Sequence, residues 1–138
     1  MAPVGSWESL MAAIQAGAGS VYFGIEKLNM RAKSSINFTL DDLKKITDIT
    51  SRHGIKTYLT LNTVIYKEDI LLMKEIIDSA KANGITAIVA SDLAVILYAR
   101  SAGLEVHIST QLNISNIEAV KFYSQYADVM VLARELNL

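Results

Sequence analysis

Hydrogen-bonding side chains alternate with apolar ones along residues 105–113, which read Glu-Val-His-Ile-Ser-Thr-Gln-Leu-Asn. Successive side chains of a β-strand point to opposite faces, so this pattern predicts one polar and one apolar face. Strands of a helix-flanked parallel sheet are usually apolar on both faces, and a polar face therefore indicates a ligand site. The polar side chains on this face could form hydrogen bonds with a ligand or exchange a proton with the ligand. The residues predicted on this face are Glu105, His107, Ser109 and Gln111.

Segments typical of helices alternate with short segments typical of strands, and a glycine follows most of the helical ones. Apolar spacing, capping residues and glycine stops predict each helix. Helices are expected from Ser6 to Gly17, from Thr39 to Gly54, from about Lys67 to Asn83, from Ser91 or Asp92 to Gly103, and after a Ser115–Glu118 capping box. Strands are expected at residues 2–4, 21–24, 56–61, 87–90, 105–113 and 129–132.

Strands that alternate with helices imply parallel pairing, in either an open doubly wound sheet or part of an eight-stranded barrel. Alternation at residues 58–62 favours the barrel, because Tyr58, Thr60 and Asn62 share one face while leucines occupy the other. A barrel interior accepts polar groups near its mouth. The 138 residues fall short of the roughly 250 of a whole barrel. We therefore expect one domain over residues 1–138, a partial barrel of five to six strands that stops before closure.

Composition sets the outer limits on function. Hydrophobic residues make up 51% of the chain, enough for a core, and the formal net charge of −1 provides no overall attraction to nucleic acid. The absence of cysteine excludes a disulfide, a thiolate nucleophile and a cysteine-bound metal cluster within these residues. No apolar run is long enough for a bilayer, and the N-terminus lacks the pattern of a signal peptide. A cytoplasmic protein without membrane contact is expected.

Several polar residues fall at or just beyond the carboxyl ends of predicted strands, where parallel α/β folds bind ligands. Each could instead cap a helix or form a turn, and Arg134 and Glu135 could form a simple ion pair. Two inward tyrosines would add an aromatic wall suited to a flat ring such as a nucleobase or a quinone precursor. The predicted substrate-binding residues of this group are Tyr22, Tyr58, Asn62, Ser91, Asp92, His107, Ser109, Gln111, Asn113 and Arg134.

Ser109, His107 and Asp92 are the residue types of a catalytic triad, with the serine as nucleophile and the histidine as base. Ser109 and His107 would stand side by side on one strand, and no nucleophile elbow of the Gly-x-Ser-x-Gly type precedes the serine. His107 is therefore either a ligand-contacting residue or a core histidine. The two catalytic candidates are His107 and Glu135. No metal-binding motif is present, and no metal is expected.

The connection from Glu26 to Asn37 is long for a loop that follows a strand. It carries Arg31, whose guanidinium could hold a carboxylate or a phosphate in a bidentate manner. A solvated loop is the alternative interpretation. We expect Arg31 to contact the substrate.

Seven stretches together resemble the collagenase-like peptidase family (family U-32), in the same order and along essentially the whole chain. The resemblance implies that the chain is the N-terminal part of a longer protein. These stretches are Ala-Pro-Val-Gly-Ser at 2–6, Ala-Gly-Ala-Gly-Ser-Val-Tyr-Phe-Gly at 16–24, Leu-Asn-Met-Arg-Ala at 28–32, Asn-Phe-Thr-Leu at 37–40, Leu-Thr-Leu-Asn at 59–62, His-Ile-Ser-Thr-Gln at 107–111 and Leu-Ala-Arg-Glu-Leu at 132–136.

Three functions stay open, and the resemblance implies two of them. Some members of the family have proteolytic activity ascribed to them. Others are linked to oxygen-independent hydroxylation of RNA bases or quinone precursors, with an iron–sulfur cluster held by cysteines beyond the equivalent of Arg134 and Glu135. A binding or assembly module without catalysis is the third possibility. An isolated fragment is expected to be inactive, and its open barrel edges are expected to pair in a homodimer.

Overall fold

The computed structural model describes residues 1–28 and 38–136 of the chain. Six parallel strands form one sheet in the order β1-β2-β3-β4-β5-β6, so strands that follow one another in sequence also lie next to one another. This is the strand order of a βα barrel that has not closed. The strands are β1 (Ala2–Pro3), β2 (Ser20–Phe23), β3 (Lys56–Leu61), β4 (Ala87–Ala90), β5 (Glu105–Ile108) and β6 (Val129–Met130).

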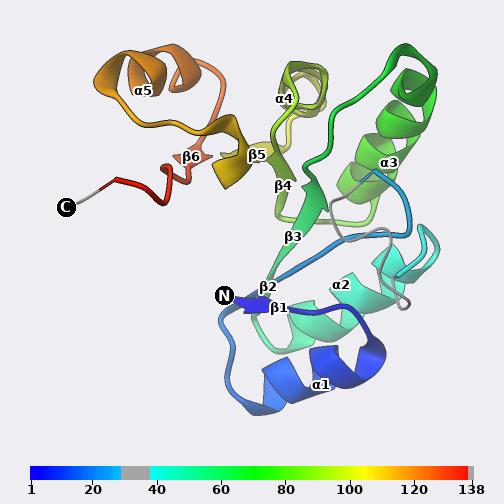
Figure 1. The fold of residues 1–138 in the computed structure, drawn as a ribbon. Helices are drawn as coiled ribbons and strands as arrows, with labels where there is room; N and C mark the ends of the chain where they lie inside the picture. The colour runs from blue at the N-terminus through cyan, green and yellow to red at the C-terminus, as the bar shows by residue number, and fades with distance from the viewer. Residues whose placement is uncertain (29–37, 137–138) are drawn as a thin grey trace.

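The helices lie around the outer side of the strands, from α1 at the bottom of Figure 1 through α3 on the right to α5 at the upper left. None of the described helices covers the opposite, inner side in that view. Short 3-10 helices, η1 (Lys67–Asp69) and η2 (Thr110–Leu112), precede α3 and follow β5. The α-helices are α1 (Trp7–Gln15), α2 (Asp42–Arg52), α3 (Ile70–Ala82), α4 (Leu93–Ser101) and α5 (Ile117–Tyr123).

The core lies between the helices and the outer face of the sheet. In β2 to β5 every second residue is buried there, for example Leu59 and Leu61 in β3 and Val106 and Ile108 in β5. The apolar faces of α1 to α4 cover them, as the helical spacing of these residues predicts. The predicted inward stripe of α3 is confirmed, because Met73, Ile76, Ile77 and Ala80 are all buried.

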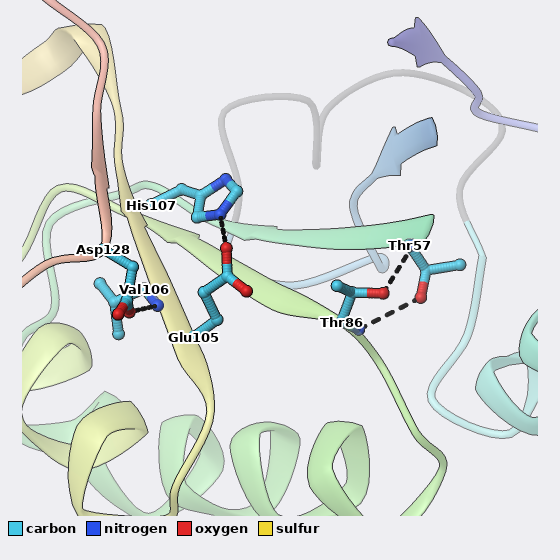
Figure 2. A network of polar contacts seen from close by, with 6 residues as sticks. All are labelled: Thr57, Thr86, Glu105, Val106, His107 and Asp128. Carbon is cyan, nitrogen blue, oxygen red and sulfur yellow. Dashed lines mark hydrogen bonds and ion pairs between the residues drawn. The ribbon is translucent and has the colours of Figure 1, made fainter. Parts of the chain in front are cut away.

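Hydrogen bonds outside the regular ladders tie neighbouring strands together at their amino ends (Figure 2). The backbone N–H of Thr57 donates to the hydroxyl of Thr86 at 3.0 Å, and the N–H of Thr86 donates back to the hydroxyl of Thr57 at 3.3 Å. The N–H of Val106 donates to the carboxylate of Asp128 at 2.8 Å. These bonds satisfy backbone groups where the strands begin, and so help to fix their register.

Three predicted elements differ from the structure. The polar strand ends at Ile108, because the chain turns into η2 and Asn113 adopts a left-handed conformation with φ 49°. The last strand has only the two residues Val129 and Met130. The fifth helix is capped by Asn116, whose side-chain oxygen accepts from the N–H of Ala119, and not by Ser115.

The predicted homodimer has a physical basis at the β6 edge of the sheet. Among the described residues, no strand other than β5 pairs with β6, and the apolar Leu132 that follows β6 is 44% exposed. Phe122 on the neighbouring α5 is 49% exposed, and α5 has no buried residue. An uncovered strand edge beside apolar side chains favours pairing with a second copy.

We expect this chain to elute as a dimer in size-exclusion chromatography with light scattering, and Leu132→Glu to shift it toward monomer. A charged residue at this edge would be costly to bury in an interface. Leu71→Glu is the matched control, since Leu71 is 81% exposed on α3. A monodisperse monomer of the unsubstituted chain would contradict the prediction.

Candidate functional site

The inner face of the sheet presents two rows of side chains that run across the strands. The strand register places Tyr22, Tyr58, Ala87 and Glu105 in the first row. It places Thr60, Val89, His107 and Val129 in the second, closer to the carboxyl ends of the strands. Residues of a row lie side by side because neighbouring parallel strands are about 4.8 Å apart. Polar and aromatic groups thus meet on the face opposite the helices.

A cavity of about 320 Å³ opens on this inner face. Its size lies within the range of about 300–1,000 Å³ that is usual for small-molecule sites. Six predicted substrate-binding residues come together there, namely Tyr22, Asn62, His107, Ser109, Gln111 and Arg134. The other lining residues are Met1, Thr60, Val89, Thr110 and Val131.

His107 is held by two neighbours. Its Nε2 lies 2.6 Å from Oε1 of Glu105, two residues earlier on the same strand, and Figure 2 shows the imidazole turned toward that carboxylate. Its ring also lies against the ring of Tyr58, with the centroids 4.8 Å apart and the planes at 47°. The His107 side chain is only 12% exposed, whereas that of Glu105 is 44% exposed. Tyr58 thus contributes to the site by supporting a lining residue, and it does not line the cavity itself.

The end of β5 brings three consecutive side chains to the cavity. Ser109 is buried, and its hydroxyl donates a hydrogen bond to Oε1 of Gln111. The turn of η2 then places both Thr110 and Gln111 on the cavity wall. A continued strand would have put Thr110 on the opposite face, so the sequence pattern missed it. Serine, threonine and glutamine in a row, followed by an asparagine suited to φ above zero, were the available signal of a turn.

Ser91 and Asp92 do not line the cavity, but they organise the loops beside it. The hydroxyl of Ser91 donates to the backbone oxygen of Asn62 at 2.9 Å, which ties the end of β4 to the end of β3. Asp92 caps α4 by accepting from the N–H of Ala94 at 2.8 Å, and it also accepts from the N–H of Ile65 at 3.1 Å. The capping interpretation of Asp92 is confirmed. Substrate contact by Ser91 and Asp92 stays a prediction.

Replacing Asp92 by alanine is expected to lower the free energy of unfolding by about 1–3 kcal/mol, because the cap and the partner of the Ile65 N–H are lost together. Urea denaturation followed by circular dichroism measures the change. Asp41→Ala is the matched control, since the side chain of Asp41 makes no capping bond to α2. Equal effects of Asp92→Ala and Asp41→Ala would show that the hydrogen bonds of Asp92 do not contribute to the stability of the fold.

Arg134 lies at the rim, where the cavity continues into a second hollow of about 360 Å³. This hollow is also lined by Gln111, Asn113 and Glu135. The structure describes both Arg134 and Glu135 and shows no ion pair between them, so the ion-pair interpretation is wrong. Both side chains are therefore available to a ligand at the rim. Arg31 lies outside the described residues.

Metal binding has no visible basis in this part of the protein. Across residues 1–28 and 38–136, no group of three or more histidine, aspartate or glutamate side chains is arranged to hold an ion. The same ranges contain no helix with the length and apolar character needed to cross a bilayer.

Six parallel strands alternating with helices, with a cavity of polar and apolar side chains at the carboxyl ends of the strands, define part of a βα barrel. Residues 5–138 match the family model described as peptidase family U32, and the chain belongs to this family. A solved structure of a U32 peptidase superposes on 95% of this chain and 56% of its own, with a TM-score of 0.76 at 12% sequence identity. That likeness supports the fold, and the predicted part of a TIM-type barrel is confirmed.

Among curated proteins, the chain is similar to a collagenase from Porphyromonas gingivalis, with 66% identity over 100% of this chain and 33% of that protein. It is also similar to the tRNA hydroxylation protein P1 of Bacillus subtilis, with 30% identity over 99% of this chain and 33% of that protein. The chain therefore spans about a third of the length of these relatives.

Proposed function

We propose that this chain is the ligand-binding part of an enzyme that hydroxylates an RNA base, and that the inner-face cavity receives the base. The observation that carries the proposal is the meeting of Tyr22, His107 and Gln111 around one cavity at the carboxyl ends of the strands. A relative over nearly the whole chain is named a tRNA hydroxylation protein.

The lining groups suit a flat ring with polar edges. An aromatic side chain such as Tyr22 offers a face on which a base stacks, and this is the usual way in which proteins bind unpaired bases. The amide of Gln111 accepts from Ser109 through its oxygen, so its NH₂ group remains as a donor for a base carbonyl. Arg134 at the rim could pair with a phosphate next to the base.

The described residues do not fit an iron–sulfur cluster. Such clusters are held chiefly by cysteine thiolates, and the chain contains no cysteine. Any cluster of the whole protein would have to be held by residues outside this chain. The part of this chain in the proposed reaction is to bind the base, orient it and exclude water from it.

The proposal is tested on RNA from cells of the source organism with and without the gene. Nucleosides from total RNA are compared by mass spectrometry, and a nucleoside heavier by one oxygen atom should disappear when the gene is deleted. A copy carrying Gln111→Ala should restore the nucleoside poorly, whereas one carrying Gln125→Ala, on a residue that does not line the cavity, should restore it fully. Identical nucleoside profiles in the two strains would contradict the proposal.

Peptide hydrolysis is the second candidate, favoured by the 66% identity to a protein named collagenase. The geometry gives it little support, because Ser109 donates to Gln111 and Nε2 of His107 faces Glu105. Asp92 is engaged by the N–H groups of Ala94 and Ile65 and is not paired with His107. Cleavage of gelatin by the purified whole protein, lost in Ser109→Ala, would reverse this order of preference.

A further inference from the structure

His107 is a lining residue whose orientation is set by side chains from two strands. Glu105 holds Nε2 from the same strand at 2.6 Å, and the Tyr58 ring of β3 lies against the imidazole at a centroid distance of 4.8 Å. With only 12% of its side chain exposed, His107 has little freedom to turn away. A buried ring held on an edge and on a face keeps one orientation.

Ala87 makes this arrangement possible. β4 lies between β3 and β5, and the register places Ala87 between Tyr58 on one side and Glu105 on the other. The backbones of β3 and β5, which are two strands apart, lie about 9.6 Å from each other, and only long side chains bridge that distance. The single methyl group of Ala87 leaves the space above β4 free for the tyrosine and imidazole rings to meet.

The contact with Glu105 assigns a different role to each imidazole nitrogen. A carboxylate accepts hydrogen bonds and does not donate them, so Nε2 of His107 carries the proton in this pair. In the neutral imidazole the other nitrogen, Nδ1, then has a free lone pair. Among the residues that the structure describes, none donates a hydrogen bond to Nδ1.

We propose that Glu105 and Tyr58 are positioning residues that fix His107 as a hydrogen-bond acceptor, through Nδ1, for a ligand ring that carries an N–H or O–H group. The inference rests on the proposed function only in placing the ligand in the same cavity. A ring without such a group leaves Nδ1 without a partner in the bound complex, and should bind about tenfold more weakly.

The test is heteronuclear NMR of the imidazole nitrogens in this chain of 138 residues. Because these residues include only two histidines, His53→Gln leaves His107 as the single reporter. In the free protein, at a pH at which the imidazole is neutral, Nε2 should give the signal of a protonated ring nitrogen and Nδ1 that of an unprotonated one. Phenol and anisole are then added as probes, since both are flat rings of similar size and only phenol has an O–H donor. Phenol should shift the Nδ1 signal, and anisole should leave it in place.

Substitution of the positioning residues supplies a second measurement. The amide of Glu105→Gln can accept from Nε2 or donate to it, so both tautomers should become populated and the two nitrogen signals should converge. Glu118→Gln is the control, because Glu118 pairs with Lys121 on the exposed α5 and should leave the signals unchanged. Tyr58→Phe should preserve them, and Tyr58→Leu should broaden them, since only the former keeps the ring contact.

A proton on Nδ1 in the free protein would overturn the proposal, as would an unchanged spectrum in Glu105→Gln. Equal responses to phenol and anisole, or a response to neither, would also overturn it while leaving RNA hydroxylation untouched. The converse result, no hydroxylated nucleoside but a selective response to phenol, would contradict the proposed function and leave the role of His107 standing.

Discussion

Replacing His107 by leucine is expected to weaken binding of an RNA base by about 10- to 100-fold without unfolding the protein. The substitution removes the hydrogen-bonding group between Tyr58 and the cavity while keeping a side chain of similar bulk. A hydrogen bond of this kind is worth about 1.5–3 kcal/mol when its partner is left unpaired, and each 1.4 kcal/mol is a factor of ten. Titration of a short single-stranded RNA into the whole protein, followed calorimetrically, gives both affinities.

His53→Gln is the matched control for that experiment. His53 lies at the exposed end of α2, where Nδ1 is 3.0 Å from the backbone oxygen of Ile49. It does not line the cavity and should not change the affinity. A similar loss in both variants would mean that histidine charge, and not the cavity, governs binding.

Replacing Leu59 by alanine is expected to lower the free energy of unfolding by about 2–5 kcal/mol. Leu59 is fully buried in β3, near the middle of the sheet, between β2 and β4. Truncation removes buried apolar surface and leaves a cavity that the rigid strand cannot close. Leu71→Ala removes the same atoms from a side chain that is 81% exposed, and should change stability by less than about 0.5 kcal/mol. Urea unfolding curves of the two variants measure the contrast.

The same leucines show why most of the fold was predictable from sequence. Leu59 and Leu61 alternate with Tyr58 and Thr60, and both leucines are completely buried in the core, as the alternation predicts, although Thr60 on the inner face is also buried. Glycine stops and capping residues located the helices within a few residues, since these signals depend on the backbone next to them. The error at the fifth helix, Asn116 in place of Ser115, arose because either residue can cap and only the geometry of the loop decides.

The candidate site was predicted less completely. Alternation placed Glu105 and His107 on one face, but it gave no sign that they would pair with each other or that Tyr58 would reach across Ala87. Those contacts depend on the register between strands, which a single sequence does not contain. The turn after Ile108 was missed because its residues also fit an alternating strand, and so Thr110 and Gln111 reach the cavity from η2.

The lining residues Met1 and Val131 show a related limit. Neither carries a group that chemistry would single out, and both line the cavity because the first residue of the chain and the segment after β6 lie beside it. Their position depends on long-range packing. Polar residues at strand ends are thus found from sequence, whereas the apolar wall that shapes a cavity is not.

An experimental structure of the whole protein with a short RNA bound would show where the base lies. We expect one base inside the inner-face cavity, in contact with Tyr22, His107 and Gln111, with its phosphate near Arg134. A base bound at the opposite ends of the strands, in the hollow lined by Lys56, Gly84 and Thr86, would contradict it, as would RNA bound over the outer helices.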